Sequence, residues 1–266
     1  MDSPIVTLTT DWGTKDFFAG MVKGRLYSMI ENVRVVDIAH NIEPFHQGNA
    51  SFIVKNACLG FPEGTIHIID VNTIEDKDTS FVVVRYRGQY FICTDNGLPY
   101  SIFGNDFEMV VQPNVYQDSN FYTFGAYHLF CKIAKLLADD TPMEDLGVRV
   151  DSLKQSTPLN FVRRDDNLLC YIQYIDNYGN AYLNISYDQF ISILGNRQFV
   201  LMVKGNKVSC ISTSYLDDPT PEHNHKTAVL LTVSSTGYLQ IAMQKASAQQ
   251  LLGLYVNDFV EFTFKD

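Results

Sequence analysis

The chain has 266 residues, of which 46% are hydrophobic and 19% charged, enough apolar side chain for one large domain or two ordinary ones. Its formal net charge of −10 argues against nucleic acid or an anionic membrane as the main partner. No apolar run approaches the roughly 18 residues of a membrane span. No signal peptide is recognisable at the start, and the 5 cysteines are scattered without a C-x-x-C pair. We therefore expect a cytoplasmic protein in a reducing compartment.

Strands and helices alternate in the first part of the chain. Apolar runs that end at turn residues predict strands at 4–9, 33–39, 65–71, 80–86, 89–93 and 108–112. Apolar residues at helical spacing predict helices at 17–30, 47–59 and 124–137, with a short one near Ser101. The alternation is typical of an α/β domain with a mostly parallel, covered sheet, which we place at residues 1–155.

The pattern changes near residues 151–155, so we expect a domain boundary between 150 and 160. Beyond it, short strands are predicted at 168–175, 181–185, 199–203, 208–212, 228–233, 238–243 and 260–264. Apart from one short helix at 247–252, almost no helix is expected there. Strands of this spacing, separated by turn residues, predict a small antiparallel barrel or sandwich at 160–266.

Polar residues follow the predicted strands of the first domain. They are Asp11, His40, Asp70 or Asn72, and the pair Asp95-Asn96. Ligands of open α/β sheets bind outside the carboxyl ends of strands, and carboxylates at such ends are costly unless solvated or paired. A shared cleft would account for all of them, and Asp11 could accept two hydrogen bonds from a ribose diol.

Each of these residues also has a purely structural interpretation. Asp11 can form a turn while Asp16 caps the following helix, and His40 can hydrogen-bond within the core. The triplet Asp95-Asn96-Gly97 makes a turn in many proteins.

A second polar cluster spans residues 174–180. Asp176 could hold an ammonium group, Tyr178 could stack on a base and Asn180 could bind polar base edges. The alternative is a hairpin turn in which Gly179 supplies a positive φ.

Other motifs give little support to competing functions. His223 and His225 could chelate a metal, but no third ligand is spaced to help them, so we expect no metal site. The chain has no G-x-G-x-x-G, Walker-type or G-x-S-x-G motif, which leaves dinucleotide, phosphoryl-transfer and serine-hydrolase functions without support.

Several stretches together resemble the S-adenosyl-L-methionine hydroxide adenosyltransferase family, which is related to fluorinases and chlorinases. In order, they are TLTTDWGTKDFFAGMVKG (7–24), VVDIAHNIEPF (35–45), FPEGTIHII (61–69), TDNGL (94–98), IDNYGNAYLNI (175–185) and SSTGYLQIAMQKASA (234–248). The resemblance implies an α/β domain followed by a small β domain. It also implies homotrimers whose sites lie between the first domain of one subunit and the second domain of its neighbour.

The resemblance further implies attack on ribose C5′ of S-adenosylmethionine, with release of methionine and without a cofactor. The enzyme then needs mainly to align the nucleophile and strip its water. The implied substrate-binding residues are Asp11 at the ribose diol, Asp16 close by, Phe45 against the ribose, Tyr178 and Asn180 at adenine, Asp176 at the methionine ammonium, Ser235 at its carboxylate, and the backbone around Lys245 at the adenine edge.

The chain departs from the family's Asp–Arg–His set, which delivers hydroxide in hydrolytic members. Without a gap, the family's Asp and Arg fall on Asn72 and Thr79; with a small deletion they fall on Asp70 and Lys77. The family's His precedes a glycine that matches Gly125, whereas this chain has His128 three residues later.

Asp70 or Asn72, Lys77 and His128 are therefore the candidate catalytic residues. The leading hypothesis is cleavage of S-adenosylmethionine to adenosine and L-methionine. The alternatives are a non-catalytic binder of S-adenosylmethionine or adenosine, and an adenosyl transferase that uses another nucleophile.

Overall fold

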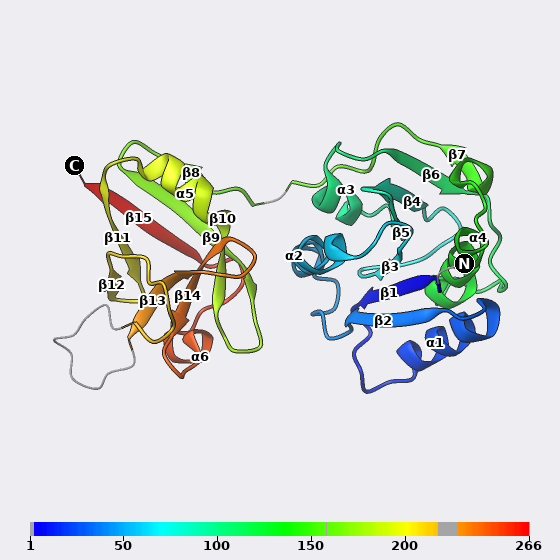
Figure 1. Cartoon of the computed structure of the whole chain (residues 1–266), viewed down its shortest axis with the longest axis horizontal. Helices are drawn as coiled ribbons and strands as arrows, with labels where there is room; N and C mark the ends of the chain where they lie inside the picture. Colours follow the sequence, from blue (N-terminus) through cyan, green and yellow to red (C-terminus); the bar gives the residue numbers. More distant parts are fainter. Residues whose placement is uncertain (1–2, 158, 218–227, 266) are drawn as a thin grey trace. The chain divides into compact units, whose positions relative to one another are not determined.

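The computed structural model describes residues 3–157, 159–217 and 228–265. The chain divides into two compact units, Met1–Thr157 and Pro158–Asp266 (Figure 1). In the part of the chain that is described, no helix is long and apolar enough to cross a membrane.

The first unit contains a seven-stranded mixed sheet in the order β2-β1-β3-β5-β4-β6-β7. Its strands are β1 (Ile5–Thr10), β2 (Arg34–Ala39), β3 (Ile66–Asp70), β4 (Phe81–Tyr86), β5 (Gln89–Thr94), β6 (Met109–Pro113) and β7 (Gly147–Arg149). Strands β2, β1, β3 and β5 are parallel neighbours, whereas β5–β4, β4–β6 and β6–β7 pair antiparallel. The expectation of a mostly parallel sheet is corrected to a mixed one. The reason is the tight turn at Arg87 and Gly88, both with positive φ, which folds β4 and β5 into a hairpin.

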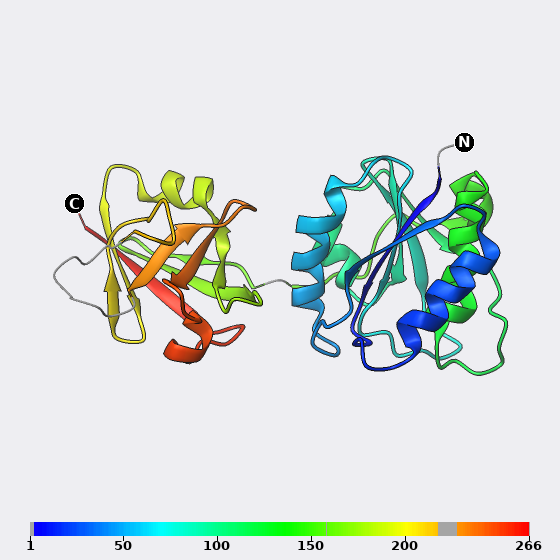
Figure 2. The same cartoon turned by 60° about the horizontal axis from the view of Figure 1, so that its bottom comes forward.

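Helices cover both faces of this sheet, as Figure 2 shows for α1 and α4 on one side and α2 on the other. The helices are α1 (Phe18–Met29), α2 (Gln47–Ala57), α3 (Leu98–Phe103) and α4 (Cys131–Ala138), with shorter turns η1 (Cys58–Gly60), η2 (Ala126–Phe130) and η3 (Met143–Leu146). In β3, Ile66 and Ile68 pack with α1 and α4, while Ile69 packs with α2 and α3. Because side chains alternate along a strand, a sheet covered on both faces needs the continuous apolar runs seen in the sequence.

The second unit is a nearly closed, antiparallel, barrel-like sheet in the order β12-β11-β15-β9-β10-β14-β13, with β8 paired to β9. Its strands are β8 (Val162–Arg163), β9 (Asn167–Ile175), β10 (Ala181–Ser186), β11 (Gln198–Val203), β12 (Asn206–Val208), β13 (Val229–Val233), β14 (Tyr238–Met243) and β15 (Phe259–Lys265). The strand expected at 208–212 ends at Val208, although Ser212 still bridges to Thr232 of β13 and draws the two edges together.

The second unit also contains α5 (Tyr187–Leu194), which the sequence pattern did not predict, and α6 (Ala248–Leu252), which it did. Helix α5 begins with a capping box in which Ser186 and Gln189 satisfy each other's main-chain N–H groups. Phe190 is its fully buried anchor, and its ring packs against Phe199 and Phe262 of the barrel core.

This packing predicts that Phe190→Ala lowers the free energy of unfolding by about 3–5 kcal/mol, because it removes a large buried side chain and leaves a cavity. Ile191→Ala on the same helix is the matched control, since Ile191 is 38% exposed. Urea unfolding followed by far-UV circular dichroism measures the free energy of unfolding of both variants. Equal losses for the two would contradict the assignment of Phe190 as the anchor of α5.

Candidate functional site

The carboxylate of Asp11 joins the loops that follow three neighbouring strands of the first unit. Asp11 comes directly after β1, and its Oδ2 accepts the main-chain N–H of Phe45 at 3.0 Å and that of Asn72 at 3.1 Å. Both donors have positive φ, +67° for Phe45 and +54° for Asn72. A phenylalanine rarely adopts this conformation without outside support, so the Asp11 carboxylate fixes the path of the loops after β2 and β3.

Asp70, the last residue of β3, lies next to Asp11 because β1 and β3 are paired through Thr10 and Asp70. Its side chain is 4% exposed, and its Oδ2 accepts the indole N–H of Trp12 at 2.9 Å. Oδ1 is buried and has no hydrogen-bond partner of ordinary geometry among the described residues.

Burial raises the pKa of Asp70 to about 7, with a further rise from the negative charges of Glu75 and Asp11. The hydroxyl of Thr73 and the indole of Trp12 oppose this rise only in part. A carboxyl group in this state can take up or release a proton near neutral pH.

Asn72 and Asn96 connect a third loop to the same network. Strand β3 ends at Asp70, so Asn72 does not continue the strand; its carbonyl accepts a hydrogen bond from Asn96 Nδ2 at 2.9 Å. Asn96 also accepts the N–H of Leu98 in the turn before α3, as the structural interpretation of that triplet required. The neighbouring Asp95 binds a different segment: both of its carboxylate oxygens accept the main-chain N–H of Lys154.

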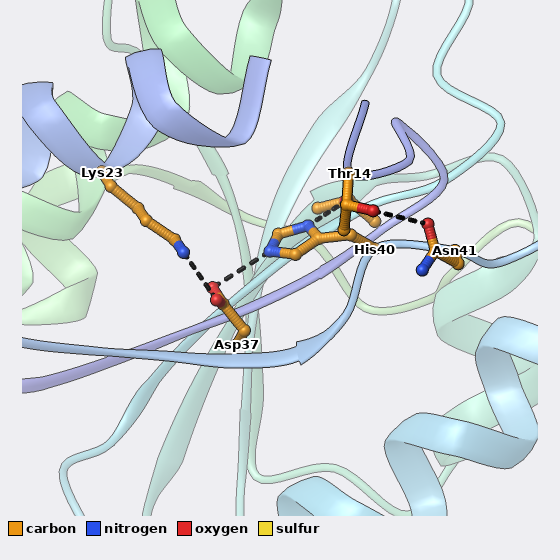
Figure 3. Close-up of polar contacts among 6 residues, drawn as sticks. Thr14, Lys23, Asp37, His40 and Asn41 are labelled. Atoms are coloured by element: carbon orange, nitrogen blue, oxygen red, sulfur yellow. Dashed lines mark hydrogen bonds and ion pairs between the residues drawn. The ribbon is translucent and has the colours of Figure 1, made fainter. Parts of the chain in front are cut away.

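His40 is a buried structural histidine rather than a free base. Its Nδ1 contacts the hydroxyl of Thr10 at 2.7 Å, and its Nε2 contacts Asp37 Oδ1 at 3.0 Å. Asp37 also forms an ion pair with Lys23 of α1, as Figure 3 shows. The interpretation of His40 as a residue that hydrogen-bonds within the core is confirmed.

Three other candidate residues make no hydrogen bond or ion pair with the Asp70 side chain among the described residues. Asp16 is exposed, and α1 is capped at Phe17 without a side-chain hydrogen bond, so the alternative interpretation, in which Asp16 caps the helix, was wrong. Lys77 is exposed on the turn between Asp76 and Thr79. His128 lies on η2 with its ring edge-on to Tyr127. Within the described residues, neither Lys77 nor His128 forms a hydrogen bond or ion pair with Asp70.

Glu75 is a half-buried carboxylate that the sequence analysis missed. It lies in the loop after β3, where its Oε1 accepts the N–H of Gly125 at 2.6 Å and its Oε2 is buried with no partner among the described residues. A Cβ on Gly125 would come within 2.7 Å of this carboxylate. Burial raises the pKa of Glu75, and the Gly125 N–H opposes that rise. No local motif marks Glu75, because its partner is 50 residues away along the chain.

In the second unit, Asp176 forms the turn between β9 and β10. Its Oδ1 accepts the N–H groups of Tyr178 and Asn180, and its Oδ2 accepts Asn180 Nδ2 at 3.0 Å. Gly179 has a φ of +81°, so the hairpin-turn interpretation of this cluster is confirmed. Tyr178 is 79% exposed at the tip, whereas Asn180 is buried.

The tip of this hairpin packs against the start of α6, since the N–H of Gln249 donates to the carbonyl of Gly179 at 2.9 Å. Lys245 is exposed, with positive φ, in the turn between β14 and α6. Ser235 is exposed in the turn that precedes β14, at the other end of that strand from Lys245. The structure thus gathers Asp176, Tyr178 and Asn180 in one turn and separates Ser235 from Lys245 by the length of β14.

Two further features do not belong to the groups of residues around Asp11 and Asp176. An open hollow of about 620 Å³ beside α1 is lined by Arg25 and Lys132, but both cations are paired with Asp118. Among the described residues, no cluster of three or more His, Cys, Asp or Glu side chains is arranged to hold a metal ion. His223 and His225 lie outside the described residues.

Comparisons with known proteins match nearly the whole chain to one family. Residues 6–147 match the SAM hydroxide adenosyltransferase N-terminal domain, and residues 170–261 match the corresponding C-terminal domain. A curated relative named (R)-S-adenosyl-L-methionine hydrolase, from Methanocaldococcus jannaschii, is 23% identical over 98% of this chain and 96% of its own length.

A fluorinase from Nocardia brasiliensis is 25% identical over 68% of this chain and 71% of its own length. The crystal structure of an uncharacterized conserved protein from Thermotoga maritima has the same fold, with a TM-score of 0.86, 23% identity, and coverage of 97% of this chain and 99% of that one. On the two domain matches, the chain belongs to the SAM hydroxide adenosyltransferase family.

Proposed function

We propose that the protein binds S-adenosyl-L-methionine and cleaves it to adenosine and L-methionine by attack of water or hydroxide at ribose C5′. The observation that carries the proposal is the pair of adjacent carboxylates, Asp11 and Asp70, at the carboxyl ends of β1 and β3 within a domain of this family. The names of the curated relatives, hydrolase and fluorinase, support the same substrate.

In this proposal Asp11 binds the ribose diol and Asp70 is the base. Asp11 Oδ2 is occupied by two main-chain N–H groups, so Oδ1 is the atom offered to the ribose hydroxyls. The unpartnered Oδ1 of Asp70 takes a proton from water as the water oxygen forms a bond to C5′. The C5′–S bond breaks, its electron pair stays on sulfur as the thioether of methionine, and Asp70 later releases the proton to solvent.

The other family-implied contacts are part of the proposal. Phe45 packs near the ribose with Asp16 close by, Tyr178 and Asn180 contact adenine with the backbone at Lys245, and Asp176 and Ser235 bind the amino-acid end of the substrate. In the second unit Asp176 already accepts N–H groups of its own turn, so an ammonium group would add to these bonds as a further donor.

The oligomeric state and the compartment are also part of the proposal. From the family resemblance we expect a homotrimer in which two subunits supply each site. We expect it in the cytoplasm, because its five cysteines are free, four of them buried. Light scattering should give three times the 30.2 kDa chain mass, and a monomer would refute this part of the proposal.

The direct test is to incubate purified protein with S-adenosylmethionine and to separate the products by chromatography. We expect adenosine and methionine in equal amounts, because one C5′–S bond is broken for each water consumed. Binding without turnover would favour the non-catalytic alternative. A different adenosyl product that appears only with an added nucleophile would favour the transferase.

Asp11→Ala should weaken binding of S-adenosylmethionine and of adenosine by roughly 10- to 100-fold, because it removes charge-assisted hydrogen bonds to the ribose. Glu43→Ala is the matched control, since Glu43 is an exposed carboxylate two residues from Phe45. Isothermal titration calorimetry measures both. Unchanged affinity in the Asp11 variant would refute the ribose assignment.

Asp70→Asn should lower kcat by about 100- to 10,000-fold while binding is retained, because the variant cannot accept the proton of water. In the wild type, kcat/KM should fall as the pH drops below about 7, since only the deprotonated form of Asp70 is a base and its pKa is about 7. Initial rates between pH 5 and pH 9 measure the profile. A flat profile across this range, or full activity of Asp70→Asn, would assign the base elsewhere.

A further inference from the structure

Trp12 lies in the turn directly after β1, and its side chain contacts the candidate base. The indole N–H donates a hydrogen bond to Oδ2 of Asp70 at 2.9 Å. The two residues are 58 apart in sequence, and the pairing of β1 with β3 brings them together.

We propose that Trp12 is a positioning residue of the reaction proposed above: its N–H holds one carboxylate oxygen of Asp70 and leaves the other, Oδ1, to the attacking water. The inference rests on the proposed function, in which Asp70 is the base. An indole N–H can donate a hydrogen bond but cannot accept one, so it fixes the carboxylate without competing for the proton that Asp70 takes from water.

The hydrogen bond favours one orientation of the Asp70 carboxylate. Oδ2 is engaged by Trp12, whereas Oδ1 is buried and has no partner of ordinary geometry among the described residues. The side chain is 4% exposed, so few water molecules can take the place of the indole. Rotation of the carboxylate would leave the indole N–H unpaired, and a donor shielded from water loses free energy when its bond is not replaced.

The indole is itself held by two aromatic neighbours. The ring of His40, which Figure 3 shows bound to Asp37, stacks on Trp12 with the centroids 6.2 Å apart and an interplanar angle of 21°. Phe124 meets Trp12 edge-on, with the centroids 5.1 Å apart and an angle of 72°. The main-chain N–H of Gly13 donates to the carbonyl of His40 at 2.7 Å and fixes the turn that carries the indole. The direction of the N–H is therefore set by the fold before a substrate binds.

The same hydrogen bond acts on the charge of Asp70. Burial is the largest influence and raises the pKa of Asp70 to about 7, and the carboxylates of Glu75 and Asp11 raise the pKa further. The hydrogen bonds from Thr73 and Trp12 oppose this rise, because they stabilise the ionised form. Trp12 therefore favours the basic form of Asp70 as well as its orientation.

The test compares Trp12→Phe with the wild type. Phenylalanine keeps an aromatic ring beside His40 and Phe124 but has no N–H to donate. The kcat for S-adenosylmethionine should fall by about 10- to 100-fold, because a misoriented base removes the proton less readily, while KM should change by less than about twofold. The acid limb of kcat/KM should move up by about one pH unit, because loss of a donor to the ionised carboxylate raises the pKa of Asp70.

A double-mutant cycle measures whether Trp12 acts through Asp70. In the Asp70→Asn background, the further change Trp12→Phe should lower kcat by less than about twofold, because the group that Trp12 positions is already gone. Phe18→Leu is the matched control. It removes a ring that packs edge-on against Phe124 and leaves the Trp12 N–H in place, so its kcat and KM should equal those of the wild type.

Trp12 also permits a test without turnover, because it is the only tryptophan of the chain. The tryptophan emission of the free protein should change between pH 5 and pH 9, with a midpoint near the Asp70 pKa of about 7. The change should be absent in Asp70→Asn. This titration leaves Trp12 intact, so it tests the contact even if Trp12→Phe folds poorly. The same change in Asp70→Asn would report another group, such as the stacked His40, and would overturn the inference.

The outcomes separate the two proposals. If the wild type releases no adenosine, the proposed function fails, and this inference fails with it. If the wild type is active but Trp12→Phe keeps kcat within about twofold, the inference alone is overturned. An equal fold loss in the wild-type and Asp70→Asn backgrounds would also overturn it, because Trp12 would then act independently of Asp70. So would an equal loss in Phe18→Leu, which would trace the effect to ring packing.

Discussion

The geometry of the candidate site depends on one carboxylate oxygen, Asp11 Oδ2, which accepts two main-chain N–H groups from loops that are distant in sequence. Each donor residue, Phe45 and Asn72, has a left-handed φ that costs of order 1–3 kcal/mol unless its surroundings enforce it. The charge-assisted hydrogen bonds to Asp11 offset part of that cost. Through the carbonyl of Asn72, the same network reaches Asn96 and the loop after β5.

This network explains how much of the site could be predicted from sequence. Polar residues at the ends of apolar strands pointed to a common edge of the sheet, and Asp11, Asp70, Asn72 and Asn96 do lie in one chain of contacts. His40 stands at a similar strand end, but it turns to Thr10 and Asp37. Strand periodicity finds the edge of a sheet, whereas the direction of a side chain there depends on hydrogen-bond partners supplied by other loops.

The fold shows a similar division between local and non-local information. The alternation of strands and helices in the first unit and the short strands of the second are local patterns, and the structure contains both. Helix α5 has a local signal in the capping box of Ser186 and Gln189, but its 8 residues are too few to show a clear helical period of apolar side chains. Glu75 had no such signal at all: its burial is set by the path of a loop and by the missing side chain of Gly125.

The apolar surroundings of Asp70 bear on why this chain can lack the family's Arg and His beside its acid. Phe124 precedes Gly125, the position where the family resemblance implies the His, and its ring packs edge-on against Trp12 at 5.1 Å. Burial and two neighbouring carboxylates make Asp70 hard to ionise when the site is empty. The proposed substrate carries its own positive charge at sulfur, next to the carbon that is attacked. A bound sulfonium would stabilise the ionised carboxylates as a protein cation does, and would therefore favour the basic form of Asp70 when the substrate is in place.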